Sequence, residues 1–389
     1  MTGAGLRVGV FLSGLTGGGA QRRSLMLAKG LVDRGCSTDI VVVRGDGPFR
    51  KLLPAGAQLV ALEPTAARMP VIGSHKALWV LSGIPALSHY LTTQRPDVLL
   101  STSTPGNLAA LWARKLSRSG VPIVITVNLN LSAAALRAGP LLGPLARRFI
   151  ASVYSGADAA IAISRGVAED LRNICAFPAD RVMQIYNPLD IEFVTARSRE
   201  PVEHSWLRPG APPVVLAVGK LKPQKDYPTL LDAFARIRAS QPAHLVILGE
   251  GEERARIERR ARELGFGDDL YMPGFVENPF AWMARASVFV LSSAWEGLSN
   301  ALLEALACGC PVVSTDCRSG PREILADGEI GPLVRVGDDK ALAEAIVTTL
   351  AAPLPRERLV ARAAEFSYDK AVDLYLAALS SVAVPRRAL

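Results

Sequence analysis

The sequence predicts an α/β protein built of two doubly wound domains, each a parallel sheet with helices on both faces. Three observations support this fold class. The chain has 389 residues, which is too long for one ordinary hydrophobic core. Short apolar runs typical of buried parallel strands alternate with helical patterns, once in each half of the chain. Between Asn187 and Pro213 this alternation lapses into a stretch rich in proline and charge.

These patterns set the predicted domain boundaries. We expect a first domain over residues 1–195, a linker over 196–213 and a second domain over 214–366. Residues 367–389 contain a further helical pattern, which we expect to cross back to the first domain. The main predicted strands lie at 6–12, 38–43, 98–101, 123–127, 159–163, 214–219, 243–248, near 270, 288–291 and 312–314.

The composition indicates a globular chain with a basic first half. The net charge is +10 over residues 1–200 and −2 over residues 201–389. This asymmetry favours an anionic partner such as a membrane surface or a phosphate-bearing acceptor, and a solvated basic surface is the alternative. Aromatic residues make up only 6% and are not interleaved with the basic ones, so we expect no nucleic-acid partner.

One segment of the first half combines apolar and basic residues. Residues 133–154 mix Leu, Phe and Ile with three arginines, and we expect Pro140 and Pro144 to break the helix there. Such a segment can rest on anionic lipid or pack in the core. The most apolar stretch, 71–91, contains His, Lys and Pro, so we expect no spanning helix. The expected location is the cytoplasm, with the inner face of the cytoplasmic membrane as a candidate site.

A glycine-rich turn between the first predicted strand and helix is a candidate binding element. Gly17, Gly18 and Gly19 allow the backbone to approach a phosphate or a sugar, beside the free amides of a helix that begins at Ala20. A simple tight turn is the alternative. The five cysteines fit no zinc spacing, and we expect them to be buried thiols.

A basic loop follows the first predicted strand of the second domain. The strand ends at Gly219, and Lys220, Lys222 and Lys225 follow before a helix begins at Tyr227. Ligands bind at the carboxyl edge of the sheet in doubly wound domains, and a diphosphate would neutralise these ammonium groups. A solvated basic loop is the alternative.

The most specific stretch covers residues 292–311. Glu296 and Glu304 are eight residues apart, roughly 80° beyond two full turns, so one continuous helix would not place them on one face. We therefore expect Glu296 in a loop and Glu304 inside a helix that begins near Asn300. Without a partner, Glu304 would be an unfavourable charge among apolar neighbours.

Together these motifs resemble the large retaining glycosyltransferase family 4. The resemblance rests on the Glu296-x7-Glu304 block, the basic loop, the Gly249–Gly251 turn and the N-terminal glycines, and it is densest over residues 214–325. It implies a GT-B fold, in which two Rossmann-like domains face a central cleft. The donor would bind mostly to the second domain and the acceptor mostly to the first.

The same resemblance implies roles for individual residues. Lys220 and Lys225 would neutralise the donor diphosphate, Glu304 would hold the ribose, and Glu296 with the amides after it would contact the transferred sugar and the phosphate. The implied nucleotide-sugar site comprises Gly17, Gly18, Gly19, Gly219, Lys220, Lys225, Gly249, Glu250, Glu296, Gly297, Leu298, Ser299, Asn300, Glu304 and Arg322.

One position departs from the family pattern. Many members carry a histidine after the strand equivalent to 123–127, and here Asn128 stands in that place. An amide can donate a hydrogen bond to a sugar hydroxyl but cannot act as a base. Asn128 joins Glu296, Lys220 and Lys225 as the candidate catalytic residues.

The implied reaction moves a hexose or N-acetylhexosamine from a nucleotide diphosphate sugar, with a UDP-sugar favoured, to a glycan or lipid-linked acceptor in bacterial polysaccharide or glycoconjugate synthesis. No metal or other cofactor is expected, because lysines and helix amides would stabilise the leaving diphosphate. The alternatives are a sugar-nucleotide epimerase or a phosphorylase on the same architecture, and a non-catalytic nucleotide-sugar-binding relative.

Overall fold

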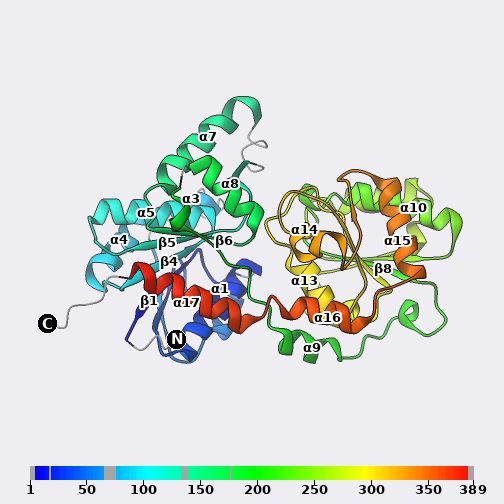
Figure 1. Ribbon diagram of the computed structural model, residues 1–389, viewed down its shortest axis with the longest axis horizontal. Coiled ribbons are helices and arrows are strands. Elements are labelled where there is room, and N and C mark those ends of the chain that lie inside the picture. Colours follow the sequence, from blue (N-terminus) through cyan, green and yellow to red (C-terminus); the bar gives the residue numbers. More distant parts are fainter. Residues whose placement is uncertain (1–4, 17–18, 65–75, 133–138, 176, 384–389) are drawn as a thin grey trace. The chain divides into compact units, whose positions relative to one another are not determined.

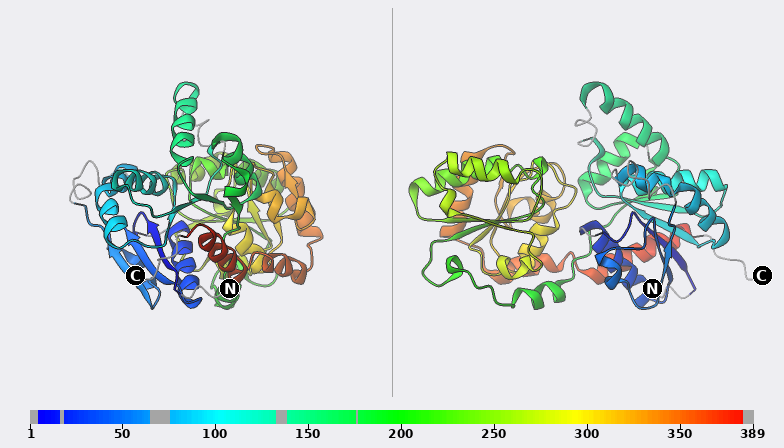
Figure 2. Two further views of the ribbon diagram at one scale, coloured as in Figure 1. Left: turned by 60° about the vertical axis from the view of Figure 1, so that its left-hand side comes forward. Right: turned by 180° about the vertical axis from the view of Figure 1, so that it is seen from behind.

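The structure is a computed structural model that describes residues 5–16, 19–64, 76–132, 139–175 and 177–383 (Figure 1). The chain divides into two compact units, which we call unit 1 (Met1–Pro188 with Asp369–Leu389) and unit 2 (Leu189–Tyr368). Each unit holds one parallel sheet with helices on both faces, as Figure 2 shows from two further directions. The predicted α/β class with two doubly wound sheets is therefore confirmed.

The sheet of unit 1 has seven strands in the order β3-β2-β1-β4-β5-β6-β7. The strands are β1 (Arg7–Leu12), β2 (Ser37–Val42), β3 (Ala57–Ala61), β4 (Val98–Thr102), β5 (Ile123–Val127), β6 (Ala159–Ala162) and β7 (Val182–Gln184). The helices are α1 (Gly19–Asp33), α3 (Lys76–Ser82), α4 (Ile84–Thr93), α5 (Thr104–Ser117), α7 (Gly139–Tyr154), α8 (Arg165–Cys175) and α17 (Tyr368–Val382).

The sheet of unit 2 has six strands in the order β10-β9-β8-β11-β12-β13. The strands are β8 (Val214–Val218), β9 (His244–Leu248), β10 (Leu270–Gly274), β11 (Val288–Leu291), β12 (Val312–Thr315) and β13 (Leu333–Val334). The helices are α9 (Ile191–Ser198), α10 (Tyr227–Ser240), α11 (Arg254–Glu263), α12 (Pro279–Met283), α13 (Asn300–Ala307), α14 (Pro321–Ile324), α15 (Asp339–Ala351) and α16 (Arg356–Ala364).

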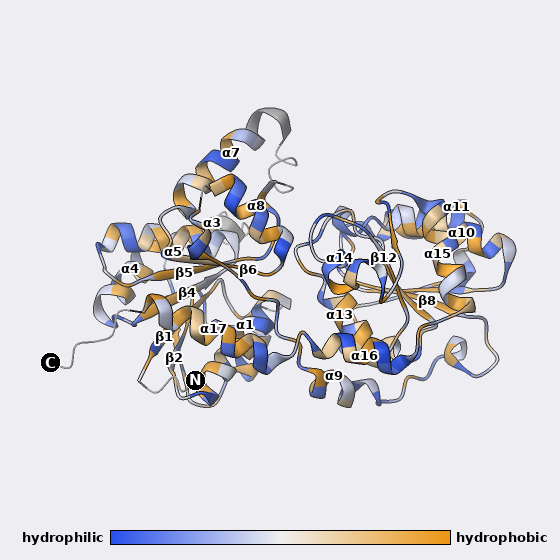
Figure 3. Ribbon diagram, in the orientation of Figure 1, coloured by the Kyte–Doolittle hydropathy of each residue, from blue (hydrophilic) through white to orange (hydrophobic). Residues whose placement is uncertain are grey.

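Apolar central strands hold both sheets inside their units. Val215 on β8 pairs with Leu245 on one side and with Val288 on the other, and all three side chains are fully buried. Figure 3 shows apolar strands inside the units and helices with one apolar and one polar side. Because both faces of a parallel sheet are covered, its strands read as continuous apolar runs. The sequence analysis did not predict three edge strands, β3, β7 and β13. They are short or half-exposed, so their sequences contain no continuous apolar run.

The predicted linker over 196–213 is not a free connection. Its residues belong to unit 2, which begins at Leu189. Asn278, before α12, donates from Nδ2 to the carbonyl oxygen of Arg197 at 2.9 Å, and the Phe193 ring meets Phe280 edge-on at 5.9 Å. The prolines and charges of this segment therefore mark an irregular segment that packs on unit 2, and the first domain ends near Pro188 and not at residue 195.

Helix α17 belongs to unit 1 although it is the last helix of the chain. Arg34, just after α1, donates to Asp373 at 2.6 Å and to Asp369 at 3.2 Å. Tyr375 of the same helix is only 3% exposed. Unit 1 thus combines the first 188 residues with a distant C-terminal helix.

The cysteines agree with their prediction, whereas the predicted break in helix α7 does not occur. All five cysteines are free and buried, as predicted, and burial raises the pKa of Cys308 to about 12. Helix α7 runs through Pro144, where a break was predicted; Pro140 lies in its first turn, where a helix needs no N–H donor. Within the described residues, no helix is long and apolar enough to cross a bilayer.

Glycines lie at the carboxyl ends of three strands of unit 2. A Cβ added to Gly249, after β9, would lie 1.9 Å from the carbonyl oxygen of Gly219, after β8. Gly249 also has a φ of 146° and donates from its amide to the carbonyl oxygen of Gly274 at 2.8 Å. The loops after these strands therefore pack backbone against backbone, which only glycine permits at this position.

We predict that Gly249→Ala destabilises unit 2 far more than Gly265→Ala. Gly265 also has a positive φ, 78°, but a Cβ there meets nothing within 4 Å, so its alanine variant carries only the backbone cost of about 1–2 kcal/mol. Gly249→Ala adds a backbone clash and should cost more than about 3 kcal/mol. At roughly 2–4 °C per kcal/mol, the melting temperature should fall by at least about 6 °C. Equal melting temperatures of the two variants would contradict this explanation.

Candidate active site

The candidate site of unit 2 lies where the strand order reverses. Strand β8 has β9 on one side and β11 on the other, so the loops after β8 and β11 leave the sheet side by side. Backbone contacts join these two loops: the Ala294 amide donates to the carbonyl oxygen of Gln224 at 2.9 Å, and Ser292 Oγ donates to that of Lys225 at 2.7 Å. Each loop therefore fixes the position of the other.

These contacts bring together two of the predicted site residues. Lys225 Nζ lies 2.7 Å from Oε1 of Glu296, and the two side chains are 17% and 7% exposed. The same carboxylate accepts hydrogen bonds from Ser293 Oγ at 2.8 Å and from Gln224 Nε2 at 3.3 Å. Charge-assisted hydrogen bonds from several sides hold the Glu296 carboxylate in one orientation.

Neutral groups surround this ion pair. Burial, followed by the charge of Glu296, raises the pKa values of the Tyr227 hydroxyl and the Cys317 thiol, so both stay protonated. Tyr227 donates to the carbonyl oxygen of Gly219 at 3.3 Å, and Thr315 Oγ1 donates to that of Ser293 at 2.6 Å. The ion pair is thus held in a largely dehydrated and well-ordered setting.

Sequence reasoning missed the polar residues that hold Glu296. Gln224 lies inside the predicted basic loop and Ser293 three residues before Glu296, so both stood within the selected motifs. Tyr227 begins α10 two residues after Lys225, so it directly follows the selected basic loop. Thr315 lies at the end of β12, far from the loop in sequence, and only the register of the sheet reveals its contact with the site.

Helix α13 starts beside the ion pair. Glu296 lies in the loop and Glu304 at the fifth position of the helix, as predicted from their spacing. Ser299 caps the helix, and its Oγ is buried without a hydrogen-bond partner among the described residues. A Cβ at Gly320 would lie 3.1 Å from the carbonyl oxygen of Gly297, so a neighbouring loop packs closely against the residues before α13. The helix N-terminus offers amides and a buried hydroxyl to an anion.

The other predicted residues of unit 2 differ from the Lys225–Glu296 pair in their burial and their contacts. Lys220 is exposed, and Asn300, the first residue of α13, and Glu304 are half-buried. Glu250 is exposed and pairs with Arg254 at 2.9 Å. Arg322 is exposed and pairs with Asp316 and Asp327. The glycines Gly219 and Gly249 shape the loop backbones, Leu298 is buried, and Gly17 and Gly18 lie outside the described residues.

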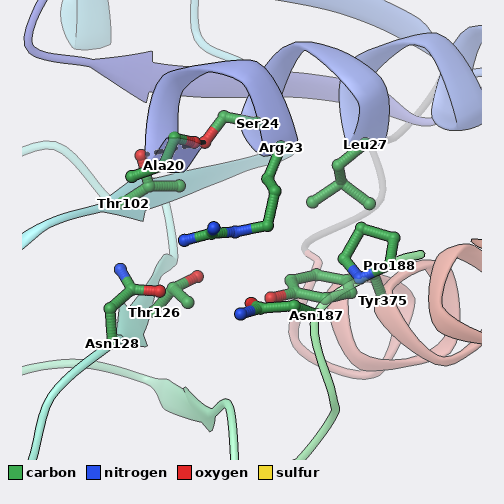
Figure 4. Close-up of a pocket in the computed structure, with 10 residues that line it drawn as sticks. All are labelled: Ala20, Arg23, Ser24, Leu27, Thr102, Thr126, Asn128, Asn187, Pro188 and Tyr375. Atoms are coloured by element: carbon green, nitrogen blue, oxygen red, sulfur yellow. Dashed lines mark hydrogen bonds between the residues drawn. The ribbon is translucent and has the colours of Figure 1, made fainter. Parts of the chain in front are cut away.

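Two predicted residues belong to unit 1. Gly19 is exposed at the start of α1, and Asn128 is half-buried just after β5. Asn128 lines a small pocket of this unit, together with residues from α1 and the ends of the central strands (Figure 4).

Comparison with known families identifies the chain. A family model described as glycosyl transferases group 1 matches residues 198–366, and one described as a glycosyl transferase 4-like domain matches residues 18–188. The chain belongs to the glycosyltransferase group 1 family. The two matches fall on the two units, and the Lys225–Glu296 pair and α13 lie within the first of them.

Individual relatives agree with this family assignment. The lipopolysaccharide core biosynthesis glycosyltransferase LpsE of Rhizobium meliloti is 28% identical over 94% of this chain and 96% of its own length. An N-acetylgalactosamine-N,N'-diacetylbacillosaminyl-diphospho-undecaprenol 4-alpha-N-acetylgalactosaminyltransferase of Campylobacter jejuni is 33% identical, and the match spans about half of each chain, 53% of this one and 54% of the relative. Both matches are to glycosyltransferases.

Solved structures show the same fold. HepE of Anabaena, in complex with UDP and glucose, has a TM-score of 0.76 and 20% identity over 97% of this chain and 100% of its own. The lipopolysaccharide outer core galactosyltransferase WaaB has a TM-score of 0.69 at 20% identity, over 97% and 99% of the two chains. The glycosyltransferase described here has the GT-B fold, as the sequence resemblance implied.

We predict that Lys225 and Glu296 are energetically coupled. In Lys225→Met the buried carboxylate loses its cation, at a cost of about 3–5 kcal/mol. The double variant Lys225→Met/Glu296→Gln should recover much of this stability, because a neutral amide needs no cation and still accepts from Ser293. Thermal unfolding of the wild type, both single variants and the double variant measures the coupling. Additive effects of the two substitutions would show that the pair contributes nothing.

Proposed function

We propose that this chain is a retaining glycosyltransferase that moves a hexose or N-acetylhexosamine from a UDP-sugar to a glycan or lipid-linked sugar acceptor. One observation carries the proposal: a buried glutamate paired with a half-buried lysine beside the N-terminus of α13, at the point where the strand order of unit 2 reverses. Ligands of doubly wound domains bind outside the carboxyl ends of the strands at this point.

The ion pair suits a diphosphate leaving group. An ammonium group has three N–H donors, so Lys225 can hold Glu296 and a phosphate oxygen together. Because Ser293 and Gln224 also hold the carboxylate, the lysine has a fixed partner before any donor binds. Donors fixed in advance stabilise the charge that develops on a leaving group without further reorganisation.

The start of α13 supplies a second group of donors. The amides after Glu296 and the buried Ser299 hydroxyl lie at the positive end of the helix dipole. Lys225 and these amides can share the negative charge of the departing diphosphate, which makes a metal ion unnecessary in this proposal. Glu304, inside the helix, is the residue we assign to the ribose hydroxyls.

The named relatives support the proposed substrates. The Rhizobium relative is named for lipopolysaccharide core biosynthesis, and the Campylobacter relative is named as a 4-alpha-N-acetylgalactosaminyltransferase acting on a diphospho-undecaprenol-linked sugar. HepE was solved with UDP-glucose. We therefore favour a uridine nucleotide as donor and a surface glycan or its lipid-linked precursor as acceptor.

We predict that UDP raises the melting temperature and that Lys225→Ala abolishes this shift. A ligand at 100 times its dissociation constant adds roughly 2.7 kcal/mol, which amounts to several degrees. Lys222→Ala is the matched control, because Lys222 is an exposed lysine of the same loop. Transfer from UDP-sugars should be lost in Lys225→Ala and Glu304→Ala.

Three results would count against the assignment. They are a UDP shift unchanged by Lys225→Ala, full turnover in Glu304→Ala, and an inverted anomeric configuration in the product by NMR. The same transfer assay in excess EDTA tests metal independence, and turnover should be undiminished.

We further propose that helix α7 makes peripheral contact with an anionic membrane. Leu145 and Phe149 are 62% and 51% exposed and lie four residues apart, so they share one helix face. Arg147 and Arg148 between them are also exposed. The helix rises from the body of unit 1 (Figures 1 and 2). An exposed apolar face flanked by arginines suits the surface of anionic lipids.

We predict that Leu145→Glu/Phe149→Glu abolishes flotation with phosphatidylglycerol vesicles at low salt. Two new negative charges on the apolar face oppose both insertion and attraction to anionic lipid. Leu116→Glu is the control, because Leu116 is 63% exposed on α5, and it should float like the wild type. Failure of the wild-type protein to float, or equal flotation of the double variant, would exclude α7 as the contact.

A further inference from the structure

Helix α14 is a single helical turn that packs against the segment before α13. It covers Pro321–Ile324 and follows Gly320, whose φ is 96°. A Cβ added to Gly320 would lie 3.1 Å from the carbonyl oxygen of Gly297 and 3.1 Å from Cα of Leu298. The backbone at the start of α14 therefore lies directly against the backbone whose amides precede α13.

The other end of α14 is held by one arginine of α16. Arg362 donates from Nε to the carbonyl oxygen of Ile324 at 2.9 Å and from Nη2 to that of Glu323. The last carbonyl groups of a helix have no donors within the helix, so a helix this short depends on outside partners. A planar guanidinium group has the fork geometry to bind both carbonyl groups at once.

The guanidinium group of Arg362 is fixed from its other sides as well. Its Nη1 donates to Oε2 of Glu365, its Cζ lies 5.1 Å from the centre of the Phe366 ring, and the side chain is 16% exposed. Phe366 is buried, and its carbonyl oxygen accepts from the Leu189 amide at 3.1 Å, beside the β-bridge between Leu189 and Ser367. The arginine therefore extends from an anchored segment of unit 2.

The first residue of α16 contacts the far end of α13. A Cβ added to Gly309, just after α13, would lie 2.3 Å from Cγ of Arg356. Gly309 has a φ of 68°, the conformation in which glycine commonly ends a helix. Helix α16 thus supports α13 directly at its C-terminal end and, through α14, at its N-terminal end.

We propose that Arg362 is a positioning residue for the donor diphosphate and acts through α14 on the backbone of Gly297 and Leu298. The proposal rests on the function proposed above, which assigns the diphosphate to Lys225 and the amides at the start of α13. Arg362 acts without touching the ligand, because it keeps these amides ordered before the donor arrives. Donors that are ordered in advance bind more tightly than donors that must be ordered on binding.

The test compares UDP binding by variants of the full-length protein, measured by isothermal titration calorimetry well below the melting temperature of each variant. Arg362→Met removes both hydrogen bonds to α14 and keeps an unbranched apolar side chain. Arg362→Lys keeps the charge, but a single ammonium group lacks the planar fork that reaches two carbonyl groups. Arg358→Met is the matched control, since Arg358 is an exposed arginine of the same helix.

We expect Arg362→Met to weaken UDP binding roughly tenfold. Arg362→Lys should bind with intermediate affinity, and Arg358→Met should bind like the wild type. Without UDP, amide hydrogen exchange over residues 297–303 should be faster in Arg362→Met than in the wild type, whereas exchange over residues 230–237 of α10 should not change. A general loss of stability would accelerate exchange in both segments, so this comparison separates positioning from a merely structural role.

Two outcomes would overturn the proposal: equal UDP affinity of Arg362→Met and the wild type, or hydrogen exchange that rises no more over residues 297–303 than over 230–237. If the wild type fails to bind UDP, the function proposed for unit 2 fails, whereas hydrogen exchange still decides whether Arg362 holds the segment before α13.

Discussion

All the strands of each sheet run in one direction, and this constraint determines where chemistry can occur in either unit. Parallel strands end at the same edge, so the loops after the central strands leave the sheet together. In unit 2 this brings Lys225, after β8, to Glu296, after β11, across 71 residues of sequence. In unit 1 the same geometry gathers Thr102, Thr126 and Asn128 around Arg23. In each unit, the strand order determines which loops, and so which side chains, meet at the edge of the sheet.

The protein itself compensates the buried charge in unit 2. Glu296 is matched within the protein by Lys225 and by neutral donors such as Ser293, so the charge is compensated before a ligand arrives. A compensated pair favours a site that keeps its shape through repeated reactions, since little has to move when a substrate binds.

The sequence predicts those features that are local in the chain. The eight-residue spacing of Glu296 and Glu304 predicts a loop followed by a helix, because helical geometry alone separates the two carboxylates. The direct contact of Glu296 with Lys225, and its support by Thr315 through Ser293, depend on sheet register, which no local pattern encodes. Sequence reasoning did not single out Arg23, because the pattern around it predicts only an ordinary amphipathic helix. The residues around 196–213 look like a linker because their packing against α12 is tertiary.

The return of α17 to unit 1 sets the order in which the two units can be completed during synthesis. Unit 2 ends at Tyr368, whereas unit 1 needs the residues from Asp369 onward. The ribosome therefore delivers every residue of the second unit before the first unit has its final helix. Until then, Arg34 lacks Asp373, and the pocket around Arg23 lacks the wall that Tyr375 provides. The N-terminal half of the chain is thus the first to be made and the last to be finished.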